Sequence, residues 1–97
     1  MSTLFILSHA PHADPNESEK LELARPGDAV ALIEDAVYGA GPAPTPMTPL
    51  LEAAAGRGVK VYALEPDLRA RGVTTALPTV DYGGLVDLIA AHHRSVH

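Results

Sequence analysis

The chain contains no cysteine among its 97 residues. This absence excludes disulfides, thiolate metal ligands and a thiol nucleophile supplied by the chain itself. Basic residues are also scarce: 7 Lys and Arg face 12 Asp and Glu, the formal net charge is −5, and no basic run occurs. Because sequence-independent nucleic-acid binding depends on clustered cations, we expect no direct contact of this chain with RNA or DNA.

Long hydrophobic runs are missing as well. The longest is far shorter than the roughly 20 residues that cross a bilayer. The start, "MSTLFILSHAPHAD", has no basic region or small-residue cleavage site of the kind found in a signal peptide. With 46% hydrophobic residues the composition is that of a globular protein. We therefore expect a single domain over residues 1–97, located in the cytoplasm and not associated with a membrane.

Apolar segments of strand length alternate with segments of helical character. Strands are predicted at 3–8, 29–33 and 59–64, with a short fourth strand in 74–81 that Pro78 restricts to an edge. Helices are predicted at 14–25, capped by Asp14 or Asn16, at 49–55, at 66–71 and from 82 onward. Four prolines in "AVYGAGPAPTPMTP" (36–49) predict a loop. This order predicts an α/β fold: a small doubly wound domain of about four mainly parallel strands with helices on both faces.

The last predicted helix has a short apolar face. Leu85, Leu88 and Ile89 are spaced for one buried side, and Asp81 is suited to cap the helix. Beyond them, His93 and His97 would share a helix face, but no further ligand joins them in a known zinc pattern. These residues are interpreted as histidines of an exposed tail.

Acidic residues follow several of the predicted strands. Glu34 and Asp35 come directly after the second strand, Glu65 follows the third, Asp81 the fourth, and His9 lies beyond the first. Because the carboxyl ends of parallel strands share one edge, these groups could form an oxygen-rich metal site. The alternative is structural: Glu34 finishes its strand and Asp35 caps the next turn. No dinucleotide-binding glycine motif, phosphate-loop lysine or nucleophile elbow is present, so residue chemistry indicates no catalytic machinery and no cofactor.

Three stretches, considered together, resemble one protein family. They are "ALIEDAVYGA" (31–40), "VKVYALEPDLRARGV" (59–73) and "VDYGGLVDLIAAH" (80–92). Their order and spacing are similar to those of the DsrH/TusB family, and "MSTLFILSHAP" is similar to the opening strand and turn of that family. The middle stretch is the most specific, and the resemblance extends over almost the whole chain.

The resemblance implies a DsrE-like subunit of a cytoplasmic sulfur-relay complex. In such a complex DsrH-like, DsrF/TusC-like and DsrE/TusD-like chains form a heterohexamer with two of each. One branch passes persulfide sulfur toward 2-thiouridine at the wobble position of tRNA, and the other serves intracellular sulfur oxidation. The main sulfur-carrying cysteine belongs to the DsrE/TusD-like partner. Some DsrH-like chains carry a cysteine at a position that falls at or near Lys20 here.

Lacking any thiol, this chain is expected to be a non-catalytic partner of a sulfurtransferase. The family's C-terminal tryptophan is also missing, and the Pro-rich loop 41–49 is atypical. Alternatives are a stand-alone homo-oligomeric DsrE-like protein, or a small metal- or ligand-binding domain that uses the strand-end carboxylates. The residues expected to form family motifs or subunit contacts are Glu34, Asp35, Tyr38, Tyr62, Asp67, Arg71, Asp81 and Tyr82.

Overall fold

A computed structural model describes residues 1–13 and 15–97, without the side chains of Pro15 and Asn16. A five-stranded sheet, parallel at every described pairing, has the order β4-β3-β2-β1-β5. The strands are β1 (Thr3–Leu7), β2 (Ala29–Leu32), β3 (Lys60–Leu64), β4 (Thr79–Val80) and β5 (Arg94–Val96). The α/β prediction is thus confirmed, with one strand more than expected, and β4 lies at an edge as Pro78 predicted.

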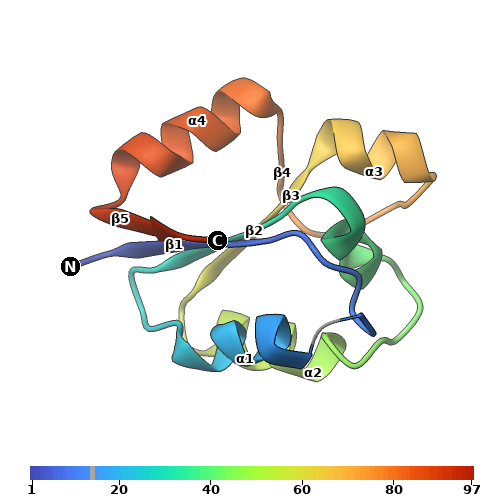
Figure 1. Cartoon of the computed structure of the whole chain (residues 1–97), viewed down its shortest axis with the longest axis horizontal. Helices are drawn as coiled ribbons and strands as arrows, with labels where there is room; N and C mark the ends of the chain where they lie inside the picture. The colour runs from blue at the N-terminus through green and yellow to red at the C-terminus, as the bar shows by residue number, and fades with distance from the viewer. Residues whose placement is uncertain (14) are drawn as a thin grey trace.

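Four α-helices and one 3-10 helix connect the strands. They are α1 (Pro15–Leu23), the 3-10 helix η1 (Glu34–Ala40), α2 (Thr48–Gly56), α3 (Glu65–Arg71) and α4 (Tyr82–Ala91). Figure 1 shows α1 and α2 side by side on one face of the sheet and α4 on the other. The predicted caps of α1, Asp14 and Asn16, lie outside the described side chains. Within the described residues, no helix has the length and apolar character needed to cross a membrane.

The face beneath α1 and α2, here called the packed face, holds most of the core. Phe5, Leu7, Val30 and Leu32 project from β1 and β2 into one cluster of 16 buried residues. Helix α1 adds Leu21 to this cluster, and α2 adds Leu51 and Ala54, while η1 and α3 also contribute. Strand residues alternate between the two faces, so each strand needs apolar residues at consecutive positions, as "TLFIL" and "AVAL" provide.

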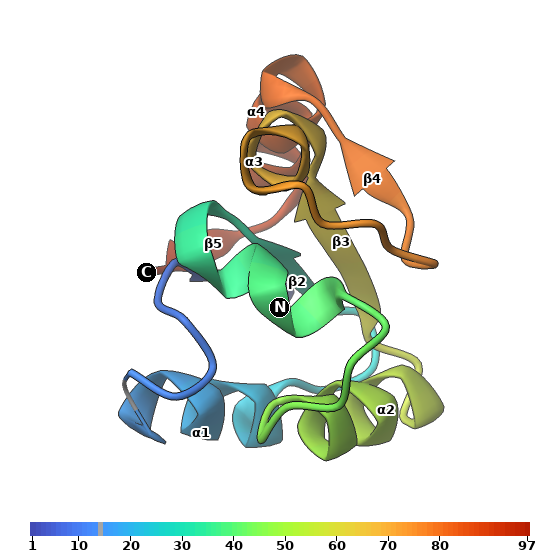
Figure 2. The same cartoon turned by 90° about the vertical axis from the view of Figure 1, so that its right-hand side faces the viewer.

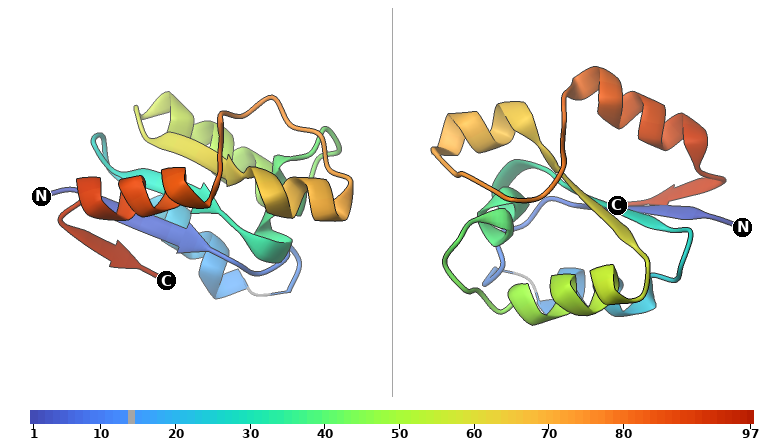
Figure 3. Two further views of the ribbon diagram at one scale, coloured as in Figure 1. Left: turned by 90° about the horizontal axis from the view of Figure 1, so that it is seen from above. Right: turned by 180° about the vertical axis from the view of Figure 1, so that it is seen from behind.

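The opposite face, here called the α4 face, is much thinner. Its buried cluster has four members: Leu4, Ile6, Ala29 and Ala31. From α4, Leu85 and Leu88 pack against this cluster but stay partly exposed, and none of the ten residues of α4 is buried. The view from above shows α4 over the strands of this face, with α3 beyond its end (Figure 3, left).

Two polar anchors fix the packed face at the amino ends of the strands. The buried Asp28 accepts hydrogen bonds from the backbone N–H of Thr3 (2.8 Å) and of Arg25 (2.9 Å), which joins the start of β1 to the turn before β2. The guanidinium of Arg57, after α2, donates to the carbonyl oxygens of Leu21 (2.8 Å) and Ala24 (3.2 Å) at the end of α1. Both anchors satisfy polar backbone groups that the packed helices would otherwise leave unpaired.

The segment after β2 differs from the prediction. Residues 36–40 were expected to be loop, yet Glu34–Ala40 form η1. All four prolines of this region follow Gly41, so "EDAVYGA" itself carries no helix breaker. The buried Ala36 and Val37 attach η1 to the packed core. Gly39 lies so close to Met47 that an added Cβ would be 2.6 Å from its sulfur.

The end of the chain also differs from the prediction. Helix α4 ends at Ala91, and Arg94–Val96 form β5, which pairs with β1 in the register Thr3 to Arg94 and Phe5 to Val96. His93 and His97 therefore do not share a helix face. Three residues with a single apolar member are too few to show a strand period. Ile89 was expected to be buried but is 42% exposed, because α4 turns Leu85 and Leu88 toward the sheet instead.

Candidate functional site

The carboxyl ends of β2 and β3 meet in a polar cluster formed by η1 and α3. The backbone N–H of Glu34 donates to the carboxylate of Asp67 (2.6 Å), and the Arg71 guanidinium binds Asp35 (2.9 Å) and approaches Asp67 (3.7 Å). Glu34 has φ of 49°, a left-handed conformation that is unfavourable for a residue with a Cβ. Figure 2 shows η1 between α2 and α3, where these contacts join it to α3.

This cluster answers the question of how the paired acids are used. The structural alternative, in which Asp35 caps the next turn, is wrong: η1 has Ile33 at its N-cap and no side-chain cap. Instead Asp35 hydrogen-bonds to Arg71, which is the first cause of a raised pKa for Arg71. Asp67 and Arg71, expected to form family motifs or subunit contacts, approach each other within the chain. Rigid positioning of η1 against α3 is the consequence.

The other strand-end acids are also held by local partners. Glu65 pairs with Arg69 one turn later in α3. Asp81 accepts a hydrogen bond from the backbone N–H of Gly84 (2.7 Å) and caps α4, as predicted. Across residues 1–13 and 15–97, no group of three or more His, Asp or Glu side chains is arranged to hold a metal ion. The acids of this edge therefore stabilise the fold around the ends of the strands.

At the end of β1, a buried carboxylate organises the loop. Glu17, only 4% exposed, accepts hydrogen bonds from the backbone N–H groups of Ser8 and His9 and contacts the Nδ1 of His9. Burial raises the pKa of Glu17. However, the hydrogen bonds from the His9 backbone and imidazole and the Ser8 backbone, together with the charge of His9, outweigh burial and lower this pKa overall. Glu17 thus stays ionised and holds His9 at the carboxyl edge of the sheet.

The sequence does not predict a special role for Glu17, because the acidic residues of α1 have the pattern of an exposed polar face. Its position in the first turn was the available signal: an acid there can reach back to unpaired backbone N–H groups of the preceding loop. His9 was noted only as a polar loop residue near a possible site. The structure brings the two together across eight positions of the chain.

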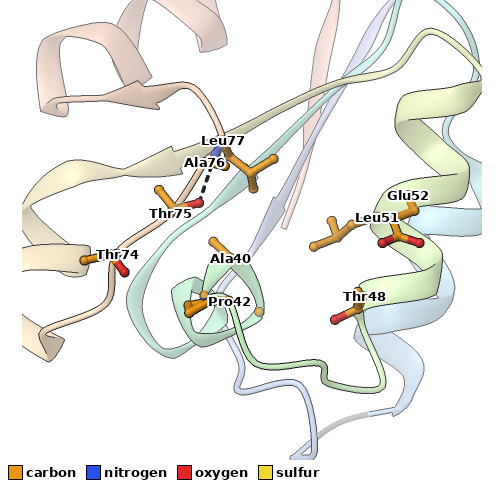
Figure 4. A pocket seen from close by; sticks show the side chains of 11 residues that line it. Ala40, Pro42, Thr48, Leu51, Glu52, Thr74, Thr75, Ala76 and Leu77 are labelled. Atoms are coloured by element: carbon orange, nitrogen blue, oxygen red, sulfur yellow. Dashed lines mark hydrogen bonds between the residues drawn. The ribbon is translucent and has the colours of Figure 1, made fainter.

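A cavity of about 420 Å³ opens between the end of η1, the start of α2 and the segment before β4. Figure 4 shows Ala40, Pro42, Leu51 and Leu77 around it, with Thr48 and Glu52 on the α2 side. Its lining is mainly apolar, and Glu52 is its one ionisable side chain among the residues that the structure describes. This arrangement suits an apolar group and offers no acid–base pair for catalysis.

The three tyrosines lie in different surroundings. Tyr62 of β3 is half-buried against the small cluster of the α4 face. Tyr38 of η1 is 46% exposed, and Tyr82, which begins α4, is 61% exposed. Tyr82 shares one stripe of α4 with Val86 and Ile89, which are 62% and 42% exposed. The structure therefore places one candidate contact residue, Tyr82, in an exposed apolar stripe.

Lys20 lies in the last turn of α1 and is half-buried. It borders a cavity beside β1 and β5. The structure therefore does not unite Lys20 with the cluster of Asp35 and Arg71.

The chain is similar to a known family in sequence and to solved structures in fold. The family profile described as "DsrH like protein" matches residues 9–95. The solution structure of protein Tm0979 from Thermotoga maritima is similar at 26% identity and a TM-score of 0.64, with 92% of each chain covered. The crystal structure of the ychN protein from E. coli has a TM-score of 0.82 at 16% identity, covers 99% of this chain and 97% of its own, and shows the fold alone. A search of curated proteins finds no match.

Proposed function

Because the chain belongs to the DsrH-like family, and is a sulfur-relay protein of the DsrH/TusB type, we propose that it is a non-catalytic subunit of a cytoplasmic sulfur-relay complex. The observation that carries this proposal is the family match over residues 9–95 in a chain without cysteine. A persulfide requires a cysteine sulfur, so the transferred sulfur must be held by another chain.

The proposed partners are DsrE/TusD-like and DsrF/TusC-like subunits, in a heterohexamer with two copies of each chain. In this complex the DsrE/TusD-like subunit carries the persulfide, and the present subunit shapes and stabilises the assembly. The complex serves either 2-thiolation of the wobble uridine of tRNA or intracellular sulfur oxidation. Neighbouring genes for a tRNA thiouridylase or for a sulfite reductase would distinguish these two roles.

The exposed stripe of α4 supports association with such a partner subunit. Tyr82, Val86 and Ile89 form this stripe, and α4 has no buried residue of its own. Isolated exposed apolar residues are ordinary, but three in line on a helix that is itself thinly packed favour a covered surface. Tyrosine is also enriched at protein interfaces.

The first experiment is purification of the tagged chain from its own cells. We expect DsrE/TusD-like and DsrF/TusC-like chains to co-purify in equal amounts. Recovery of the chain alone, together with an absence of genes for both partners nearby, would refute the proposal. Light scattering of the isolated chain tests the alternative of a stand-alone homo-oligomer, which predicts a defined mass above that of one chain.

A matched pair of variants tests the stripe. Val86→Asp places a charge on α4, and Ala53→Asp places the same charge on the exposed side of α2. We expect the first to reduce partner recovery at least about tenfold and the second to leave recovery unchanged, because an unpaired charge at the centre of an interface is strongly unfavourable. Circular dichroism of both variants checks that each is folded. Equal recovery with both variants would place the interface elsewhere.

A further inference from the structure

A groove runs between α1 and β5 along the edge of the packed face. Its floor comes from two neighbouring strands: Thr3 and Phe5 of β1 lie beside Arg94 and Val96 of β5 in the parallel register. Lys20 in the last turn of α1 borders the same space, which has a volume of about 420 Å³. Figure 3 shows β5 at the sheet edge beside β1, with α1 beneath the sheet.

The positive side chains of the chain divide into two groups. Arg57, Arg69 and Arg71 each bind carbonyl or carboxylate oxygens. In contrast, within residues 1–13 and 15–97, the side chains of Lys20, Arg25, Lys60 and Arg94 form no hydrogen bond or ion pair. Three of these four, Lys20, Arg25 and Arg94, line the groove. The cations left without a partner are therefore concentrated in one place.

Among the described residues that line the groove, one acid faces these three bases. Asp28 lines it, but this carboxylate is buried and already accepts two backbone hydrogen bonds, from Thr3 and Arg25. The formal charge of these four side chains is thus +2 (three positive, one negative) in a chain whose formal net charge is −5. A cavity with a net positive charge in a protein of net negative charge has a local positive potential that attracts an anion.

We propose that this groove binds a small divalent oxyanion, such as thiosulfate, sulfate or phosphate. A guanidinium presents paired N–H donors that match two oxygens of such an anion, and an ammonium adds a compact charge. The groove offers both kinds of donor from two sides, with Arg94 on the strand and Lys20 on the helix. Phe5 and Val96 form an apolar floor that lowers the local dielectric and strengthens these contacts.

The test uses the whole chain labelled with ¹⁵N and titrated with sodium thiosulfate, sulfate or phosphate, with sodium chloride holding the ionic strength constant. We expect saturable shifts of backbone amides around Lys20 and Arg94, with a Kd of roughly 1 mM at low ionic strength, which salt weakens. Thermal unfolding should shift upward with the same anions, because a ligand of the native state stabilises it.

The chain provides a matched control. Lys60 is also a cation without an ion pair, but it lies outside the groove. We expect Lys20→Gln and Arg94→Gln each to weaken binding at least about threefold, with Lys60→Gln unchanged. Amide shifts that do not saturate would show general screening and overturn the proposal. The same conclusion would follow if Lys60→Gln weakened binding as much as Lys20→Gln and Arg94→Gln. This result is independent of the proposed relay function, which the co-purification experiment tests without any anion.

Discussion

The two faces of the sheet differ in how many residues they bury. The packed face has a cluster of 16 buried residues shared by the strands, α1, α2, η1 and α3, and Arg57 joins α2 to α1 by hydrogen bonds. The α4 face has a cluster of four buried strand residues, and α4 itself has no buried residue. The strands contribute to this difference, since β2 turns Val30 and Leu32 to the packed face and the smaller Ala29 and Ala31 to the α4 face. The comparison indicates that the packed face contributes most of the stability of the fold. The α4 face is where apolar side chains remain exposed.

The largest expected effect comes from matched leucine truncations on the two faces. Leu21→Ala in α1 removes a fully buried side chain and should lower the free energy of unfolding by about 3 kcal/mol. Leu88→Ala in α4 removes a partly exposed side chain, and we expect a loss of about 1 kcal/mol. Urea unfolding of both variants measures the difference, and equal losses would contradict the distinction between the faces.

A smaller effect is expected from the carboxylate that anchors α1 to the loop after β1. Glu17→Ala leaves two backbone N–H groups without their acceptor and should cost about 2 kcal/mol at neutral pH. Because folding lowers the pKa of Glu17, its ionic contribution is present above the ordinary carboxyl pKa and is lost as the pH falls through the lowered value.

The pH dependence of Glu17 can be measured against its amide. Glu17→Gln keeps an acceptor oxygen but not the charge, so it should be less stable than the parent at pH 7. The gap should narrow as the pH falls below the ordinary carboxyl pKa of about 4.3 and through the lowered pKa of Glu17, where the folded carboxylate becomes protonated. Unfolding curves from pH 3 to pH 7 provide this measurement, and a gap independent of pH would show that the charge has no role.

The smallest effect is expected at the cap of α4. Asp81→Ala removes the acceptor for Gly84 and should cost about 1 kcal/mol, because four N-terminal N–H groups of a helix lack partners within it. Hydrogen exchange should quicken in α4 and remain unchanged in α1 and α2, since these two helices lie on the opposite face of the sheet. Asp81→Asn, which keeps an acceptor, is the control. Faster exchange throughout the chain would mean that α4 supports the whole fold.

Much of the architecture could be predicted from the sequence because its signals are local. Continuous apolar runs such as "AVAL" indicated buried parallel strands, Pro78 indicated an edge strand, and Gly72 ended α3 in the left-handed conformation expected of a helix terminus. What escaped prediction depends on distant partners. Strand β5 exists through its pairing with β1, and Ile89 is exposed because tertiary packing sets the rotation of α4.

The candidate site was harder to predict for the same reason. The acids after β2 were visible in the sequence, but their partners lie 33 and 36 positions away in α3. Glu17 and His9 are close in sequence, but only the return of α1 toward the loop shows that they meet. The motif residues resemble those of the DsrH/TusB family, and the family match confirms that resemblance.

The two outermost strands have a consequence for how the sheet meets other chains. Strand β4 has two residues directly after Pro78, and β5 has three, beginning with Arg94. Short edges marked by proline and charge are poor templates for a further strand from another molecule. Growth of the sheet by side-by-side pairing, the route to fibres, is thereby discouraged. Neighbouring chains are then expected to bind over a face of the sheet. The thinly covered α4 face would bury the most additional apolar surface in such a contact.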